Sequence, residues 1–193
     1  MSHKINILAI SGSTRKNSSN GNLIKAIAML TTAIFTIEIF EGIDMLPHFN
    51  PDLDYGQVEE NAQVAEFRRK ISAADAILIC TPEYALGVPG TLKNAIDWTV
   101  STMNFSQKPV ALITASTAGT RGHQSLLGTL LIIESKITKD TEVLISSIQT
   151  KVNSDLEITD QETLGLINKL INSLIEMVKG NVPVETLLPA PLL

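Results

Sequence analysis

The chain alternates between short apolar runs and amphipathic helical segments along nearly its whole length. Five apolar runs are expected to be strands, at residues 4–10, 35–40, 76–81, 109–115 and 141–147. Helical spacing predicts five helices, at residues 21–32, 58–74, 89–100, 122–135 and 159–178. Near-continuous apolar strands are typical of a parallel sheet covered on both faces. At 193 residues the chain is short for an eightfold barrel of about 250. We therefore expect an α/β, three-layer sandwich whose five parallel strands have the order 2-1-3-4-5.

The chain is expected to form a single domain over residues 1–180, because neither a repeat nor a long linker divides it. Residues 181–193 form an apolar, proline-punctuated tail. This tail is either a frayed end or a strap across a partner subunit, and the sequence does not choose between them.

Composition excludes several classes of function. A net charge of −5 without a cluster of Lys or Arg argues against a nucleic-acid partner. Without a cationic leader or an apolar run near 18 residues, we expect no membrane association and a cytoplasmic location. Cys80, the single cysteine, is expected to be a buried small hydrophobe rather than a reactive thiol. The three histidines are too scattered to predict a metal site.

The loop after the first strand has the composition of a phosphate site. It reads Ser-Gly-Ser-Thr-Arg-Lys-Asn-Ser-Ser-Asn over residues 11–20 and leads into a helix. Gly12 permits a turn, the hydroxyls of Ser13 and Ser18 can donate hydrogen bonds, and the helix N-terminus favours an anion. Arg15 can offer a two-pronged donor to phosphate oxygens. The alternative is a polar turn that only caps the helix.

The loop after the third strand could lie against a flat ring. Pro82 stiffens this turn, Gly87 permits close backbone approach, and Tyr84 offers an aromatic surface. Glu83 and Asp97 could be read as an acid/base pair, but we favour capping or solvated roles for both. The helical stretch Leu-Lys-Asn-Ala-Ile-Asp-Trp that follows, at residues 92–98, is expected to pack on the sheet.

Both loops resemble signatures of the NADPH-dependent FMN reductase family, which has a flavodoxin-like fold. The first loop matches the pattern Gly-Ser-x-Arg-x-x-Ser-x-Asn, which that family uses to hold the FMN phosphate. The second resembles Pro-Glu-Tyr-Asn-x-Ser-x-Pro followed by Leu-Lys-Asn-Ala-Ile-Asp-Trp. It departs from that pattern at Ala85, where Asn is usual, and at Gly87, where Ser is usual. Residues 46–54 and 115–124 resemble further family segments, the second of them loosely.

The resemblance implies the residues that bind the cofactor. Ser13, Arg15, Ser18 and Asn20 are implied as phosphate ligands. The full set of expected FMN-binding residues is Ser11, Ser13, Arg15, Ser18, Ser19, Asn20, Pro82, Glu83, Tyr84, Ala85, Ser116, Thr117 and Gly119. The family also uses the helix over residues 92–98 in subunit pairing, which implies an interface role for Trp98 and a homodimer or homotetramer.

The implied activity is that of an FMN-dependent NAD(P)H oxidoreductase. NADPH or NADH would pass hydride to FMN, and a flavin, quinone, azo compound or metal oxyanion would then take the electrons, in a ping-pong sequence. We assign no catalytic acid, base or nucleophile. One alternative is a flavodoxin-like electron-transfer protein that does not oxidise NAD(P)H directly. Another is a flavin-free scaffold or signalling domain of the same fold.

Overall fold

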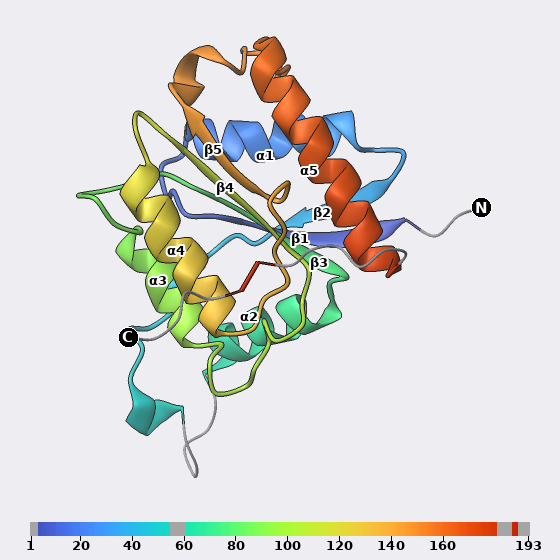
Figure 1. The fold of residues 1–193 in the computed structure, drawn as a ribbon. Helices are drawn as coiled ribbons and strands as arrows, with labels where there is room; N and C mark the ends of the chain where they lie inside the picture. The colour runs from blue at the N-terminus through green and yellow to red at the C-terminus, as the bar shows by residue number, and fades with distance from the viewer. Residues whose placement is uncertain (1–3, 55–60, 181–186, 189–193) are drawn as a thin grey trace.

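The computed structural model describes residues 4–54, 61–180 and 187–188. Its strands and helices alternate along the chain, as Figure 1 shows. The strands are β1 (Ile5–Ser11), β2 (Phe35–Ile39), β3 (Ala76–Thr81), β4 (Val110–Ser116) and β5 (Glu142–Ser146). The α-helices are α1 (Ser19–Leu30), α2 (Ala62–Ala73), α3 (Gly90–Asp97), α4 (Thr120–Ile132) and α5 (Gln161–Lys179). Short 3-10 turns are η1 (Ile43–Met45), η2 (Pro51–Leu53) and η3 (Ile148–Thr150).

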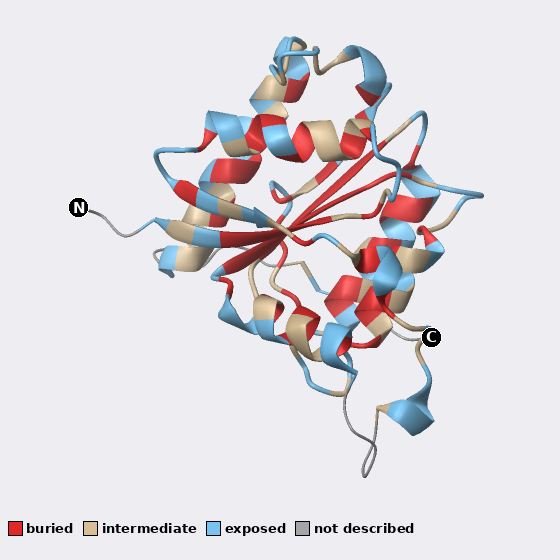
Figure 2. Cartoon of the chain, turned by 180° about the vertical axis from the view of Figure 1, so that it is seen from behind, coloured by how far each residue is buried: buried red, intermediate tan, exposed pale blue. Residues whose placement is uncertain are grey.

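The five strands form one parallel sheet in the order β2-β1-β3-β4-β5, which confirms the predicted topology. The strand order reverses at β1, which pairs with β2 on one side and with β3 on the other. Helices α1 and α5 cover one face, and α2, α3 and α4 cover the other (Figure 1). Among the described residues, the central strands are continuously buried (Figure 2), and all six residues of β3 are buried.

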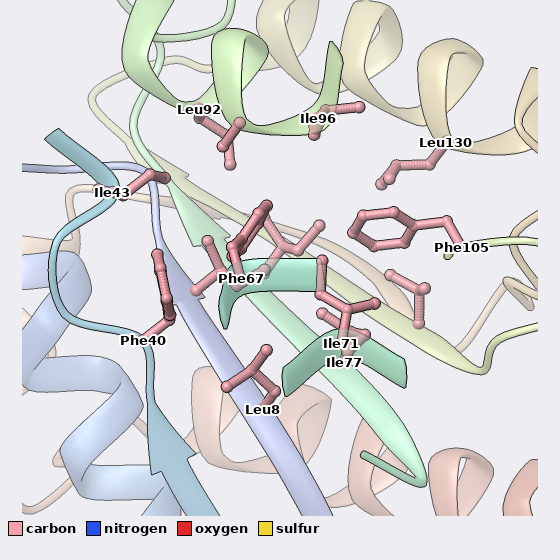
Figure 3. Packing of buried hydrophobic residues seen from close by; sticks show 14 of the residues in the cluster. Leu8, Phe40, Ile43, Phe67, Ile71, Ile77, Leu92, Ile96, Phe105 and Leu130 are labelled. Atoms are coloured by element: carbon pink, nitrogen blue, oxygen red, sulfur yellow. The ribbon is translucent and has the colours of Figure 1, made fainter. Parts of the chain in front are cut away.

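The alternation of side chains along each strand divides the core into two layers. In β1, Ile7 and Ala9 face α1 and α5, whereas Leu8 and Ile10 face the layer built by α2, α3 and α4. Figure 3 shows the second layer, in which Phe67 of α2 lies among aliphatic side chains from the sheet and the helices. Its ring lies 4.6 Å from that of Phe40, measured between ring centroids.

Element boundaries differ from the sequence-based expectations mainly at capping residues. Helix α1 begins at Ser19, two residues before the apolar periodicity, because Ser18 supplies its N-cap. Helix α2 begins at Ala62 because Asn61 accepts hydrogen bonds from the N–H groups of Gln63 and Val64. The strand β4 continues to Ser116, one residue beyond the apolar run.

The loop after β2 is held against α3 by the motif at residues 92–98. The Asn94 side chain accepts a 2.7 Å hydrogen bond from the Phe49 N–H and donates to the Pro47 carbonyl at 3.0 Å. The indole N–H of Trp98 donates to that same carbonyl at 2.8 Å. Trp98 is only 2% exposed within its own chain. The expected interface role for its side chain is therefore wrong, because the indole is already buried against this loop.

The tail lies largely outside the described residues, so neither reading of it is tested as a whole. Leu187 is described, and its N–H donates to the Ile137 carbonyl at 2.7 Å. Its side chain packs against the core layer that contains α2, α3 and α4. In the parts of the chain that are described, no helix combines the length and the apolar character that a membrane span requires.

We predict that Phe67→Ala lowers the free energy of unfolding by about 3–5 kcal/mol, because it empties a large site in the packed core. Met29→Ala, at a residue 56% exposed, is the control and should change that free energy by less than about 0.5 kcal/mol. Urea denaturation measures both variants. Equal stability of the two variants would contradict this account of the core.

Candidate functional site

The candidate site lies at the carboxyl edge of the sheet, where β1 and β3 end side by side. Ser11 and Cys80 are paired in register, and the Gly12 N–H donates to the Cys80 carbonyl at 2.8 Å. A Cβ atom on Gly12 would come within 2.2 Å of the Thr81 hydroxyl oxygen. Only glycine lets the two loops touch at this point without displacement. The loops after β1 and β3 therefore begin in contact, and in such a sheet this crevice is where ligands bind.

The loop after β1 turns directly into the N-terminus of α1. The Ser18 side chain caps the helix by accepting a hydrogen bond from the Gly21 N–H at 3.4 Å. Within the loop, the Ser13 N–H donates to the Ser11 hydroxyl at 3.2 Å, and that hydroxyl donates to the Ser13 carbonyl at 3.1 Å. Ser11 therefore shapes the turn. The first N–H groups of α1 and its positive dipole end face the loop, which is a favourable arrangement for an anion.

A hollow of about 290 Å³ lies between this loop and the segment that leaves β2. Three cationic residues, Arg15, Lys16 and Lys25, line it on the side of the loop and α1. Glu41 and Asp44 line it on the other side. The hollow is also lined by Ser11, Ser13, Thr14, Ser18, Gly21, Asn22, Ile39, Phe40, Gly42 and Ile43. Positive charge is thus concentrated beside the N-terminus of α1.

Asn20 differs from the other residues expected at the phosphate, because its side chain points into the sheet. It is 4% exposed, and its Nδ2 donates to the Ala115 carbonyl at 3.1 Å. Its Oδ1 accepts a hydrogen bond from the Cys80 thiol at 3.2 Å. Asn20 thereby joins the first turn of α1 to β3 and β4. Its side chain holds the helix in place. The group with which Asn20 could bind an anion at the first turn is therefore its backbone N–H.

Cys80 is fully buried, as expected. Burial raises the pKa of the Cys80 thiol far above its ordinary value, because the thiolate would lose its hydration. The residue is therefore a thiol that donates a weak hydrogen bond, which confirms the interpretation of a buried small side chain.

The loop after β3 forms a tight hairpin at Tyr84–Gly87. Tyr84 and Gly87 exchange two backbone hydrogen bonds, of 3.1 and 2.9 Å. The two residues between them, Ala85 and Leu86, have positive φ angles of 50° and 62°. Asn and Gly are the residues that usually occupy such a turn, so the replacement of the family's Asn by Ala85 adds backbone strain. The hairpin exposes Tyr84 and Leu86 at the edge of the sheet.

The loop after β4 lies next to this hairpin and is joined to it by Glu83. One Glu83 carboxylate oxygen accepts a 2.6 Å hydrogen bond from the Gly122 N–H in the first turn of α4. Asp97 instead pairs with Lys93 on the surface of α3, with 2.6 Å between Oδ1 and Nζ. The capping role favoured for Glu83 is confirmed, whereas Asp97 is half-buried in an ion pair rather than simply solvated. Sequence reasoning did not single out Gly122 as a partner of Glu83, although a glycine in the first turn of a helix is a signal of close approach.

The remaining predicted residues occupy the same edge. Ser116 is half-buried at the end of β4, Thr117 is exposed, and Gly119 has a φ angle of +92° immediately before α4. Pro82 is buried at the base of the hairpin. The structure thus places the loops after β1, β3 and β4 together at one edge, as the parallel topology requires.

The buried side chain of His123 anchors the start of α4 to β4 and β5. The His123 Nε2 donates to Glu142 of β5 at 2.5 Å, and its Nδ1 lies 2.9 Å from the Thr114 hydroxyl. Burial alone would raise the pKa of Glu142, but hydrogen bonds from Lys139 and His123 hold that pKa below its ordinary value. Sequence reasoning did not anticipate this cluster, because His123 and Glu142 are separated by 19 residues and meet only in the fold.

These residues fit FMN at both of its ends. The loop after β1 combines hydroxyls, three cationic side chains and a helix N-terminus, which are the groups that bind a phosphate ester. The hairpin supplies the exposed aromatic side chain of Tyr84 next to the loop after β4, which suits a planar heterocycle.

Comparisons with known proteins agree with this chemistry. The family model for NADPH-dependent FMN reductase matches residues 5–150. An NAD(P)H-dependent FMN reductase from Pseudomonas aeruginosa is 36% identical over 179 residues, covering 90% of this chain and 95% of that protein. A quinone reductase from Escherichia coli is 33% identical over 172 residues, covering 85% and 90% respectively. Among solved structures, the flavoenzyme NAD(P)H:(acceptor) oxidoreductase FerB from Paracoccus denitrificans has a TM-score of 0.81 at 25% identity. The match covers 95% of this chain and 100% of that chain.

We predict that Asn20→Ala lowers the free energy of unfolding by about 1–3 kcal/mol, because the Ala115 carbonyl and the Cys80 thiol lose their buried partner. Asn22→Ala, two residues along α1, is the matched control and should change it by less than about 0.5 kcal/mol. Chemical denaturation of the flavin-free protein measures both. An Asn20→Ala protein as stable as the Asn22→Ala protein would contradict the structural role of Asn20.

We also predict that Ala85→Asn raises the free energy of unfolding by about 0.5–1 kcal/mol, because Asn adopts a positive φ angle more readily than Ala. Ala85→Val should lower it, since a β-branched side chain tolerates that conformation poorly. Thermal unfolding of the two variants gives the comparison. If both variants shift stability in the same direction, the strain does not lie at this turn.

Proposed function

The chain belongs to the NADPH-dependent FMN reductase family, and we propose that its carboxyl edge binds FMN and serves NAD(P)H and an electron acceptor in turn. It is an FMN-dependent NAD(P)H oxidoreductase. When bound, FMN supplies the redox chemistry by accepting a hydride and passing electrons to an acceptor. Every other part of the reaction is the task of the protein: to hold the ligand, to orient it and to leave one side accessible.

The phosphate anchor is the loop after β1 together with the first turn of α1. The observation that carries the proposal is that this helix N-terminus faces a hollow lined by Arg15, Lys16 and Lys25. We assign the phosphate to the Arg15 guanidinium, to the hydroxyls of Ser13 and Ser18, and to the first N–H groups of α1, at Ser19 and Asn20. The Ser18 oxygen accepts the Gly21 N–H, so its own proton is left to donate to an anion.

The ring end of the cofactor is assigned to the residues that flank the edge of the sheet. Pro82, Tyr84 and Ala85 lie on the side of the β3 hairpin, and Ser116, Thr117 and Gly119 lie on the side of the β4 loop. Backbone polar groups in these loops are fixed by the strands and α4, so they need little rearrangement to meet charge on a ring. We assign no side-chain acid or base, because Glu83 is committed to the Gly122 N–H and Asp97 to Lys93.

We propose a ping-pong sequence, for which one accessible side of the bound ring would suffice. NADH or NADPH and the acceptor would occupy the same place in succession, beside the exposed side chains of Tyr84 and Leu86. The relative from Escherichia coli is named a quinone reductase, which supports a quinone as acceptor. Free flavins, azo compounds and metal oxyanions are further acceptors of this class.

We also propose a homodimer or homotetramer in the cytoplasm. Exposed apolar side chains of Val100, Met103 and Ile132 gather where the segment after α3 meets the end of α4. Such a patch favours pairing between copies of the chain.

A buried, unpaired Cys80 accords with a reducing compartment.

The phosphate anchor is tested with Arg15→Ala. We expect its dissociation constant for FMN to rise by about 10- to 100-fold, as for the loss of a charged hydrogen bond. Affinity for riboflavin, which lacks the phosphate, should stay within about twofold of the original protein. Flavin fluorescence quenching measures both, with Arg69→Ala on the exposed side of α2 as the control.

Two results would contradict the proposed function. Unchanged FMN affinity in Arg15→Ala would remove the anchor. A protein that binds FMN but whose flavin is not bleached by NADH or NADPH in a stopped-flow experiment would be an electron carrier instead of an oxidoreductase.

A further inference from the structure

We propose that Glu83 is a positioning residue for the flavin ring. Its carboxylate, together with Gly122, forms a clasp that joins the β3 hairpin to the first turn of α4. The inference deepens the proposed function and rests on it, because the two joined segments are those assigned to the ring. Glu83 would thus act through the hairpin, without contacting the flavin through its own side chain.

The contact between the two segments is close on both sides of the hydrogen bond. Glu83 accepts the Gly122 N–H at 2.6 Å, a charge-assisted bond at the positive end of a helix. A Cβ atom on Gly122 would lie 3.0 Å from the Glu83 Cγ and 3.0 Å from the Gly87 carbonyl oxygen. The hairpin therefore rests against α4 at both of its ends, and glycine is the residue that leaves room for it.

The hairpin needs this external support. Its two central residues, Ala85 and Leu86, both have positive φ angles, which are unfavourable for residues with a side chain. The hairpin contributes two backbone hydrogen bonds of its own, between Tyr84 and Gly87. Strained backbone persists where the surrounding structure holds it, and the Glu83–Gly122 clasp is the contact that does so here.

Helix α4 is the fixed side of the clasp. The His123 N–H donates to the Gly119 carbonyl at 2.9 Å, and the His123 ring is held by Thr114 and Glu142. This buried cluster fixes the residue next to Gly122. When the carboxylate is removed, the hairpin is consequently the part that moves.

The test compares Glu83→Ala with Glu83→Gln in binding of FMN and of riboflavin. We expect Glu83→Ala to weaken both flavins by the same factor, about tenfold, because the ring contacts change and the phosphate anchor does not. Glu83→Gln should recover most of this loss, because its amide oxygen can accept the same hydrogen bond. Asp97→Ala, which removes a surface carboxylate from α3, is the matched control and should bind both flavins normally.

A second variant approaches the clasp from the other side. Gly122→Ala keeps the carboxylate but fills the space under the hairpin, so it should also weaken FMN and riboflavin equally. Visible circular dichroism of the bound flavin should change in Glu83→Ala and in Gly122→Ala, but not in Asp97→Ala.

Hydrogen exchange in the flavin-free protein tests the clasp without any ligand. The Gly122 amide should exchange at least about tenfold faster in Glu83→Ala than in the original protein, and at the original rate in Asp97→Ala. If the original protein binds no FMN, the proposed function fails, while this exchange measurement still tests the clasp. The inference is overturned if Glu83→Ala leaves the Gly122 amide protected and both flavin affinities unchanged, or if it weakens FMN alone.

Discussion

The contact between the ends of β1 and β3 determines where this molecule can bind a ligand. The Gly12 N–H donates to the Cys80 carbonyl, and the space beside Gly12 is filled by Thr81. Because the strand order reverses at β1, the chain leaves these two adjacent strands toward opposite faces of the sheet. In such a sheet ligands bind in the crevice beside this point, which has the N-terminus of α1 on one side and the β3 hairpin on the other. Cationic groups and a helix N-terminus lie on one side of it, and the β3 hairpin, joined to the first turn of α4, lies on the other.

Much of the polar side-chain chemistry near this crevice serves to hold the surrounding loops. Asn20 connects α1 to the strands behind it, Glu83 connects the hairpin to α4, and Asn94 with Trp98 connects the loop after β2 to α3. The groups left for a ligand are mainly backbone N–H groups, hydroxyls and the cationic side chains of Arg15, Lys16 and Lys25. Such a site suits a cofactor that carries its own reactivity, because the protein needs to supply position and charge and not a proton-transfer group.

The sequence predicts the sheet and its order well, because β3 and β4 are nearly continuous apolar runs and the helices have strong periodicity. It also predicts which loops share an edge. It does not predict which way each polar side chain points: Asn20 and Trp98 turn inward because partners far along the chain, at Ala115 and Pro47, are brought beside them by the fold. The sequence also does not predict the positive φ angles of Ala85 and Leu86, since neither residue favours them and tertiary contacts hold them.

The most direct test of this account is a crystal structure of the protein grown with excess FMN. We expect density for the phosphate within hydrogen-bonding distance of the Arg15 side chain and the first N–H groups of α1, with the ring beside the β3 hairpin. A phosphate bound elsewhere on the protein, or a crevice filled by the protein's own side chains while FMN is absent, would contradict it.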